Sequence, residues 1–459
     1  MGTDTTTEST DSDTVPAASH PDHEATHSVV GGAHAFILRI SSFLGLAPLR
    51  FQDHSNGFMV SISNPMCIYS YILVTVLVIT AIIGHISEIY VGVKLSVRMS
   101  SPMSQVVSTC DVMIVVATAC AGVYGAPRRM RNMLKFMGSV ASVDNSIGGR
   151  YSVATERKLC AILLSILTFF TVLIIDDVCF YAIQARKVDR QWSVVINYST
   201  YYILWYVVMI LELQFAFTAL SIRARFQAVN DALALTAKNV SVPLESSTEL
   251  NIYAIRVAPA DSRANVSLLM EPVPEKDAVI IKKAANGDPR LIVSPSDAVH
   301  RLSTLHGSLC EVVQCIDENY GVPLVVVLIS TLLHLIVTPY FLIMEIIVST
   351  HRIHFLVLQF LWCATHMMRL IVVVEPCHYT IFEGRRTQSL VCRLLMASPI
   401  ANTTLPTRLE LFSRQLMLQT TCYAPMGMCT LDRPLIASIL GAVTTYLVIL
   451  IQFQRYDSL

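Results

Sequence analysis

The sequence predicts an all-α integral membrane protein with seven transmembrane helices. Of its 459 residues, 53% are hydrophobic and only 14% are charged, and the mean hydropathy is +0.56. Soluble domains carry about 25% charged residues, so this composition is poorly suited to a water-facing surface. Seven apolar runs, separated by polar segments, each approach the roughly 20 residues that a membrane helix needs. These observations favour a bilayer as the solvent for most of the chain.

The seven expected spans differ in how clearly they are marked. The second contains Asp111 and many small residues and is the least distinct. The seventh follows Arg433-Pro434, and proline is well placed at the start of a helix. The expected spans cover residues 67–87, 105–124, 159–183, 194–222, 322–348, 355–374 and 435–453.

The distribution of basic residues predicts the orientation. With a cytoplasmic N-terminus, 25 of the 33 Lys and Arg residues fall in segments that face the cytoplasm. Cytoplasmic loops are enriched in Lys and Arg, although long loops count less in this rule. The bias persists when the long segment between spans four and five is left out. We therefore expect a cytoplasmic N-terminus and, after seven crossings, an extracellular C-terminus.

Composition divides the chain into six regions. The first 30 residues are rich in Thr, Ser, Asp and His and predict a disordered tail, and a proline-rich segment with mixed charges predicts a flexible insertion. Leu405, Leu409, Phe412 and Leu416 share one helix face between spans six and seven. The expected regions are a disordered cytoplasmic tail (1–33), an amphipathic N-terminal helix with spans one to four (34–222), a flexible cytoplasmic insertion (223–299), a cytoplasmic helix extension with spans five and six (300–375), cytoplasmic anchor helices (376–433), and a pore helix with the extracellular C-terminus (434–459).

The sequence gives no sign of an enzyme. It contains no nucleophile elbow, phosphate-binding loop or zinc-protease motif, and its twelve cysteines show no metal-binding spacing. We therefore expect no catalytic residue, no metal site and no cofactor. The formal net charge is zero, so bulk charge gives no reason to expect a nucleic-acid partner.

Span seven carries a stripe of small and polar residues. Ser438, Gly441, Ala442, Thr445 and Gln452 recur near helical spacing. One interpretation is a pore lining with an aromatic constriction, which can block ions by dewetting. The other is ordinary packing, because small residues also let membrane helices approach closely. Periodicity alone does not separate the two, and a pore would need several subunits around an axis.

The end of span seven resembles the signature of insect gustatory receptors. Residues 445–453 read Thr-Tyr, five hydrophobic residues, then Gln-Phe, and the segments 431–435 and 441–444 are also similar to that family. Farther upstream, residues 44–49, 97–100 and 122–125 resemble the fructose-receptor branch, as does the long insertion. The resemblance covers almost the whole membrane portion.

This resemblance implies a function and an assembly. The chain would be a sugar-gated, non-selective cation channel in the plasma membrane, with D-fructose as the leading ligand. The implied fold is the tetrameric insect chemoreceptor channel, a homotetramer that could also form heteromers with related receptors. Monovalent cations and calcium would permeate, and span seven would line the central pore. The implied pore and gate residues are Gln452, Phe453, Thr445, Tyr446 and Ile449.

The same resemblance places the ligand in the outer half of spans three to six. In span six, Gln359 and Trp362 are three residues apart and share a face, and this pair resembles the sugar-contacting pair of the fructose branch. A sugar presents axial C–H groups to an aromatic plane and hydroxyls around its rim, which suits Trp with polar neighbours. The expected ligand-binding residues are Trp362, Gln359, Asp176, Asp177, Tyr340, Thr338, Thr365, Tyr201, Trp205 and Glu345.

Structural roles remain open for several of these residues. A carboxylate near the membrane centre costs about 2.5–3.5 kcal/mol on insertion scales, so Asp176 and Asp177 should face either a wet cavity or a partner on another helix. Aromatic residues in span four, such as Tyr201 and Trp205, also match an interfacial belt. The alternative functions are a metabotropic seven-span chemoreceptor for another tastant, which the charge bias disfavours, and a secondary transporter, which commonly shows internal repeats that are not evident here.

Overall fold

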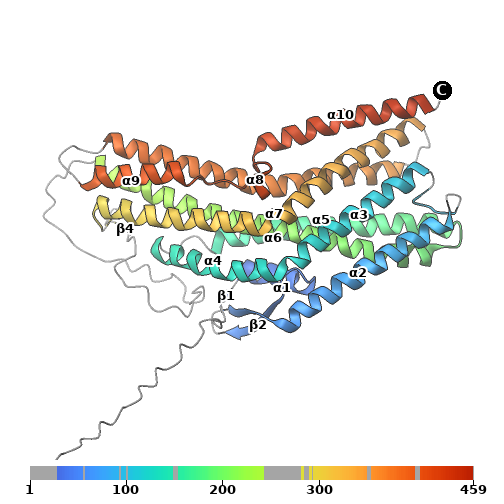
Figure 1. Cartoon of the computed structure of the whole chain (residues 1–459), viewed down its shortest axis with the longest axis horizontal. Coiled ribbons are helices and arrows are strands. Elements are labelled where there is room, and N and C mark those ends of the chain that lie inside the picture. Colours follow the sequence, from blue (N-terminus) through green and yellow to red (C-terminus); the bar gives the residue numbers. More distant parts are fainter. Residues whose placement is uncertain are drawn as a thin grey trace, which may run out of the picture.

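The structure, a computed structural model, confirms that the chain is predominantly helical (Figure 1). It describes residues 28–30, 32–54, 57–92, 95–99, 102–147, 153–241, 281–283, 289–291, 293–348, 353–397 and 404–457. Among these, seven helices are long and apolar enough to cross a membrane. They are α2 (Asn64–Val91), α3 (Pro102–Tyr124), α5 (Val153–Arg186), α6 (Gln191–Ser241), α7 (Pro295–Val348), α8 (Ile353–Ala397) and α10 (Arg433–Asp457).

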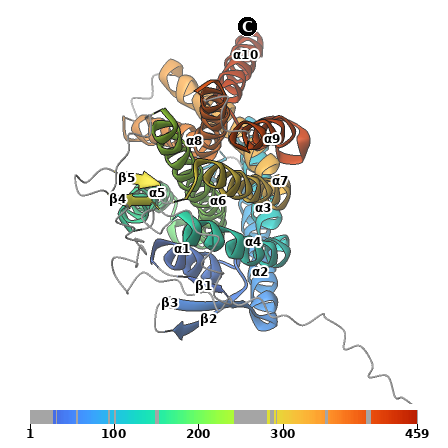
Figure 2. The same cartoon turned by 90° about the vertical axis from the view of Figure 1, so that its left-hand side faces the viewer.

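Helix α6 forms the centre of the bundle, and α10 lies at its edge. In the most apolar part of each helix, 83% of α6 is buried inside the chain but only 11% of α10. Helices α2, α3, α5, α7 and α8 all pack against α6. Both views place α10 at the periphery, beside α7 and α8 (Figures 1 and 2). The described residues of a single chain therefore bury only a small part of α10.

Helices α6 and α7 extend beyond the boundaries expected from the sequence. The flexible insertion was expected from residue 223, but α6 continues to Ser241. Phe226, Val229 and Leu233 are each fully buried and recur at helical spacing, so this stretch packs as one helix face. Likewise, α7 begins at Pro295 rather than at residue 300. Most of the remaining insertion lies outside the described residues.

Three shorter helices complete the helical structure of the described residues. These are α1 (Gly32–Phe43), α4 (Ala126–Ile147) and α9 (Thr404–Leu418), with a 3-10 turn at Pro425–Gly427. The predicted apolar face of α9 is the buried one, since Leu405, Leu409 and Phe412 are at most 2% exposed. Helix α9 packs against α7 and α8, so those three helices form a cluster at one end of the bundle (Figure 1).

Small sheets were not predicted. Strands β1 (Ser28–Val30), β3 (Gly57–Ile62) and β2 (Leu49–His54) form an antiparallel sheet in the order β1-β3-β2. The sheet lies beside α1 and α4 at the edge of the bundle (Figure 2). The expected amphipathic N-terminal helix therefore ends at Phe43, and Leu49 already pairs with Ile62 in the sheet. Strands β4 (Ile281–Lys283) and β5 (Pro289–Leu291) form a separate hairpin.

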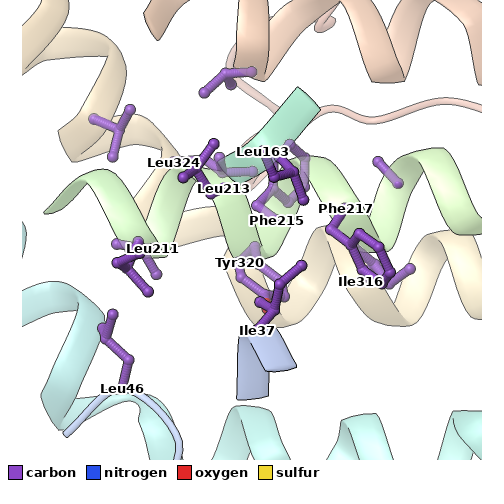
Figure 3. Packing of buried hydrophobic residues seen from close by; sticks show 14 of the residues in the cluster. Ile37, Leu46, Leu163, Leu211, Leu213, Phe215, Phe217, Ile316, Tyr320 and Leu324 are labelled. Atoms are coloured by element: carbon purple, nitrogen blue, oxygen red, sulfur yellow. The ribbon is translucent and has the colours of Figure 1, made fainter. Parts of the chain in front are cut away.

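Large side chains from four helices interlock around α6. Phe215 of α6 packs against Tyr320 of α7 with ring centroids 5.4 Å apart, and Ile37 of α1 and Leu163 of α5 belong to the same cluster (Figure 3). Lipid tails are as apolar as these side chains, so in the membrane close packing rather than escape from water stabilises such contacts.

Helices α2 and α6 approach each other unusually closely. A Cβ atom built on Gly84 would lie 2.3 Å from the carbonyl oxygen of Asn197. One turn farther along α2, the buried carboxylate of Glu88 accepts hydrogen bonds from Arg190 (3.0 Å) and from the Asn197 side chain (2.9 Å). These contacts fasten the end of α2 to the start of α6.

Candidate functional site

A cavity of about 310 Å³ opens between five helices of the bundle. Its walls come from α3, α5, α6, α7 and α8, together with Val97 and Arg98 from the connection between α2 and α3. Pockets that bind small molecules span about 300–1,000 Å³ and combine apolar walls with a few convergent polar groups. We call this space the bundle cavity.

The bundle cavity brings together most of the residues that the sequence singled out for ligand binding. The paired residues Gln359 and Trp362 of α8 both line it. The other predicted residues that line it are Asp177, Tyr201, Trp205, Thr338 and Glu345.

Three predicted residues do not line the bundle cavity. Consecutive helical residues differ in direction by about 100°, so Asp176 and Asp177 cannot share a face. Asp177 is buried, whereas Asp176 lies at the surface and contacts His354 Nε2 at 3.2 Å. The Thr365 hydroxyl donates to the Leu361 carbonyl at 2.8 Å, and the Tyr340 ring is buried with its centroid 5.6 Å from that of Phe341.

Asp177 is held by two hydrogen-bond donors from other helices. Trp362 Nε1 donates to its Oδ1 at 3.2 Å, and the hydroxyl of Tyr202 donates to Oδ2. A carboxylate that accepts two such bonds is compatible with burial in a way that a bare carboxylate is not. The bond from Trp362 also fixes the indole ring, whose plane stacks on His366 with a centroid separation of 5.7 Å.

Asp111 is a second, partly buried anchor that was not among the ligand-binding residues predicted from the sequence. The Tyr201 hydroxyl donates to Oδ2, His334 Nε2 contacts Oδ1 at 2.7 Å, and Arg98 Nη2 lies 3.7 Å from Oδ2. The Arg98 guanidinium also lies 5.1 Å from the centre of the Tyr201 ring. The available signal was a lone carboxylate in an otherwise apolar span, which needs a partner.

Hydrogen-bond chemistry determines where protons sit on the two cavity histidines. His334 Nδ1 contacts the Ser330 carbonyl, and a carbonyl only accepts, so Nδ1 carries a hydrogen. The contact between His334 Nε2 and Asp111 then contains one further proton. In contrast, His366 Nδ1 faces Arg369 Nη1 at 3.4 Å, and a guanidinium only donates. Neutral His366 therefore carries its hydrogen on Nε2 and offers a donor.

A fully buried ion pair lies directly behind the cavity wall. Arg369 Nη2 and Nε contact Glu212 Oε1 at 2.6 and 3.0 Å, and both side chains are 0% exposed. The Arg369 guanidinium also lies 4.8 Å from the centre of the Trp205 ring. The pair thus orients His366 and Trp205, two aromatic side chains that line the cavity.

Most charged groups of the bundle cavity have partners within the protein. Arg98 and His334 lie against Asp111, and Asp177 accepts hydrogen bonds from Tyr202 and Trp362. A charged ligand would have to break these pairs at a large desolvation cost. A neutral ligand with hydroxyl groups can exchange hydrogen bonds with them instead.

The residues predicted to form a pore lie on the exposed side of α10. Thr445, Tyr446, Ile449 and Gln452 are all exposed in the single chain, and the side chain of Phe453 lies outside the described ones. The opposite side of α10 packs through Ile439 and Val443 onto α7 and α8. Because the two sides differ in this way, the exposed stripe is available for contacts beyond this chain.

The family of the chain follows from comparison with known proteins. The model of the seven-transmembrane chemosensory receptors matches residues 34–456. The chain belongs to this receptor family. Membership of a receptor family also supports the expectation that the chain is not an enzyme, and together with the seven apolar helices it establishes a multi-pass membrane protein.

Relatives of this chemosensory receptor include taste receptors. It is 28% identical over 432 residues to the gustatory receptor for sugar taste 43a of Drosophila melanogaster, covering 91% of this chain and 97% of the relative. It is 29% identical over 171 residues to the putative gustatory receptor 28a of the same species, which covers 35% of this chain and 37% of that relative. The resemblance to insect gustatory receptors, and to their sugar-receptor branch, is confirmed.

Solved structures support the fold of the receptor. The insect olfactory receptor OR5 from Machilis hrabei, in complex with eugenol, matches with a TM-score of 0.57 and 11% identity, covering 92% of this chain and 97% of that chain. A second structure of the same olfactory receptor matches with a TM-score of 0.58 and 12% identity at the same coverage. At this level of identity the likeness concerns the fold alone.

Proposed function

We propose that this receptor is a sugar-gated, non-selective cation channel of the plasma membrane, with D-fructose as its leading ligand. The ligand occupies the bundle cavity, and α10 lines a central pore in a homotetramer. The N-terminus is cytoplasmic and the C-terminus extracellular, as the distribution of basic residues predicts. Monovalent cations and calcium permeate, and related receptors can take the place of some subunits.

The observation that carries the proposal is the chemistry of the bundle cavity. It combines aromatic surfaces from Trp362 and Trp205 with polar groups from Gln359, Thr338 and Asp177. The aromatic surfaces suit the C–H groups of a sugar, and the polar groups suit its hydroxyls. Asp111 is paired with Arg98, and Asp177 accepts hydrogen bonds from Trp362 and Tyr202, which favours a neutral polyol over an ion. The relationship to a receptor for sugar taste supports the same ligand class.

The surroundings of α10 support a pore between subunits. Its small and polar stripe, including Gly441 and Thr445, faces away from the rest of the chain. One helix cannot enclose a pore, so several copies must surround an axis. We expect a weak, millimolar affinity for the sugar, which corresponds to a binding free energy of only about −4 kcal/mol. Opening therefore depends on a modest preference of the ligand for the open state.

Expression in cells that lack taste receptors tests the proposal. D-fructose should produce an inward cation current, and a panel of sugars should define the selectivity. Trp362→Ala should abolish the response while surface expression is retained. The matched control is Trp192→Ala, because Trp192 is 72% exposed and does not line the bundle cavity. Absence of current from wild-type protein at the cell surface would contradict the channel, and a normal dose–response of Trp362→Ala would remove the bundle cavity as the site.

A tag after residue 459 tests the orientation and separates the channel from a metabotropic receptor. Antibody should reach the tag on unpermeabilised cells if the C-terminus is extracellular. Detection only after permeabilisation, together with sugar responses that require a G protein, would support the metabotropic alternative.

A further inference from the structure

The base of α10 is fastened to α8 by two neighbouring residues. Arg433 Nε and Nη2 contact Glu375 Oε1 and Oε2 at 2.8 and 3.0 Å, which makes a two-bond ion pair. Asp432 Oδ1 accepts from His378 Nδ1, and the same oxygen accepts the Arg433 backbone N–H at 2.8 Å. The first turn of α10 therefore has a defined position and direction relative to α8.

The residues of α8 that hold α10 lie on both sides of a proline. Glu375 immediately precedes Pro376, and His378 follows it by two positions. Proline lacks the N–H that would bond to the carbonyl of residue 372, so the helix is most easily bent here. A bend at Pro376 would displace Glu375 relative to His378, and through them Arg433 relative to Asp432.

Two further contacts broaden this attachment. Arg385 of α8 lies 3.6 Å from Asp432 Oδ2. Tyr379 is contacted by two guanidinium groups, with Arg433 5.5 Å and Arg223 of α6 4.3 Å from its ring centre. The position of the base of α10 therefore depends on contacts with α8 and, through Tyr379, on α6. These are the two helices that bring Trp362 and Trp205 to the bundle cavity.

Beyond its base, α10 has few contacts within the described part of its own chain. Ile439 and Val443 pack on Leu335, Leu370 and Val374, but Tyr446, Val448 and Ile449 are exposed. With so few contacts along its length, the direction of α10 depends on how its first turn is oriented.

We propose that Glu375, His378, Asp432 and Arg433 form a joint at Pro376 that transmits ligand binding along α8 to the pore helix. Trp362 precedes Glu375 by thirteen residues, or about 20 Å of helix. A ligand that displaces Trp362 tilts the cavity half of α8, and the joint converts that tilt into a rotation of α10. These four are positioning residues that touch neither ligand nor ion. The inference rests on the proposed channel function, but its first test does not.

Hydrogen exchange of the purified, ligand-free receptor tests whether the joint holds α10. Glu375→Gln and Asp432→Asn should each speed amide exchange in residues 434–443. The matched control is Arg386→Gln, which breaks 3.3 Å ion pairs with Asp231 of α6 and Glu383 of α8, neither of which belongs to α10. Unchanged amide exchange in both joint variants would show that the joint does not hold α10, and so would an equal increase in the control. This conclusion would stand whether or not the protein is a channel.

Swapping the charges of Glu375 and Arg433 tests whether the joint transmits ligand binding to the pore helix. Glu375→Arg and Arg433→Glu should each raise the sugar concentration for half-maximal current about threefold, as expected for a partly exposed ion pair. Sugar binding to the bundle cavity should be unchanged. The double variant should recover the wild-type value, and additive losses would overturn the transmission. If the wild type passes no sugar-evoked current, the channel proposal fails, and the exchange experiment still decides whether the joint exists.

Discussion

The ion pair between Arg369 and Glu212 gives the sharpest stability prediction. Arg369→Met leaves a buried carboxylate without its cation, a change that costs about 3–5 kcal/mol in protein interiors. Arg369→Met also removes the contact with the Trp205 ring, which contributes up to about 2 kcal/mol when desolvated. Part of this contribution is already included in the cost of breaking the ion pair. We therefore expect a loss of about 4 kcal/mol, a large share of a typical total of about 5–15 kcal/mol.

Thermal unfolding in detergent measures this loss. An unfolding entropy of about 2.1 cal/mol/K per residue corresponds to about 1 kcal/mol/K for 459 residues, so the apparent Tm should fall by about 4 °C. The control is Arg225→Met, which removes a similar two-bond pair with Asp144 whose side chains are 13% and 32% exposed. Water still reaches that pair, and its loss should cost about 1 kcal/mol.

The double replacement Arg369→Met with Glu212→Leu separates pairing from packing. Removing both charges together should restore most of the lost stability, because no charge then remains buried alone. A fall in Tm for Arg369→Met no larger than that of the Arg225→Met control would refute the reasoning. So would a double variant as unstable as Arg369→Met alone.

Three further predictions follow from other contacts. His366→Gln keeps an N–H donor near the Nε2 position and should preserve sugar sensitivity, whereas His366→Leu should raise the half-maximal sugar concentration about fivefold. Equal effects of the two variants in dose–response recordings would refute the assignment of Nε2 as a donor. Gly84→Ala should cost about 1–3 kcal/mol because its Cβ meets the Asn197 carbonyl, while Gly441→Ala, with open space around it, should not lower the Tm. Gln452→Ala should change basal current or ion selectivity with unaltered sugar binding, and unchanged current–voltage relations would argue against its place at the pore.

The sequence predicted the membrane helices well because their signal is strong and local. A run of about 20 apolar residues has few alternatives to a membrane helix. Boundaries were less accurate where packing, not hydropathy, decides them. Helix α6 continues to Ser241 because Phe226 and Leu233 bury a face against the rest of the chain, which a hydropathy reading of the spans does not show. The β2–β3 hairpin was not predicted, because its two strands have only six residues each and lie outside the apolar runs that hydropathy marks.

The sequence predicted the aromatic residues of the bundle cavity and two of its carboxylates, Asp177 and Glu345, but not the cluster around Asp111. Gln359 and Trp362 are three residues apart, so their shared face follows from helix geometry. Arg98, Asp111 and His334 come from three separate parts of the chain, and only the packing of α3 against α7 brings them together. Contacts between residues so far apart in the sequence cannot be predicted from local sequence patterns.

The tyrosines that hold Asp111 and Asp177 have a consequence for the thermodynamics of recognition. Tyr201 and Tyr202 already give these carboxylates the same kind of hydroxyl that a polyol offers. In the proposed sugar complex, a sugar hydroxyl would replace that of Tyr201, which lines the bundle cavity, and the number of hydrogen bonds would hardly change. Calorimetry should then record a small enthalpy, and discrimination among isomeric sugars should depend on how closely one of their hydroxyls reproduces the position of the Tyr201 phenol.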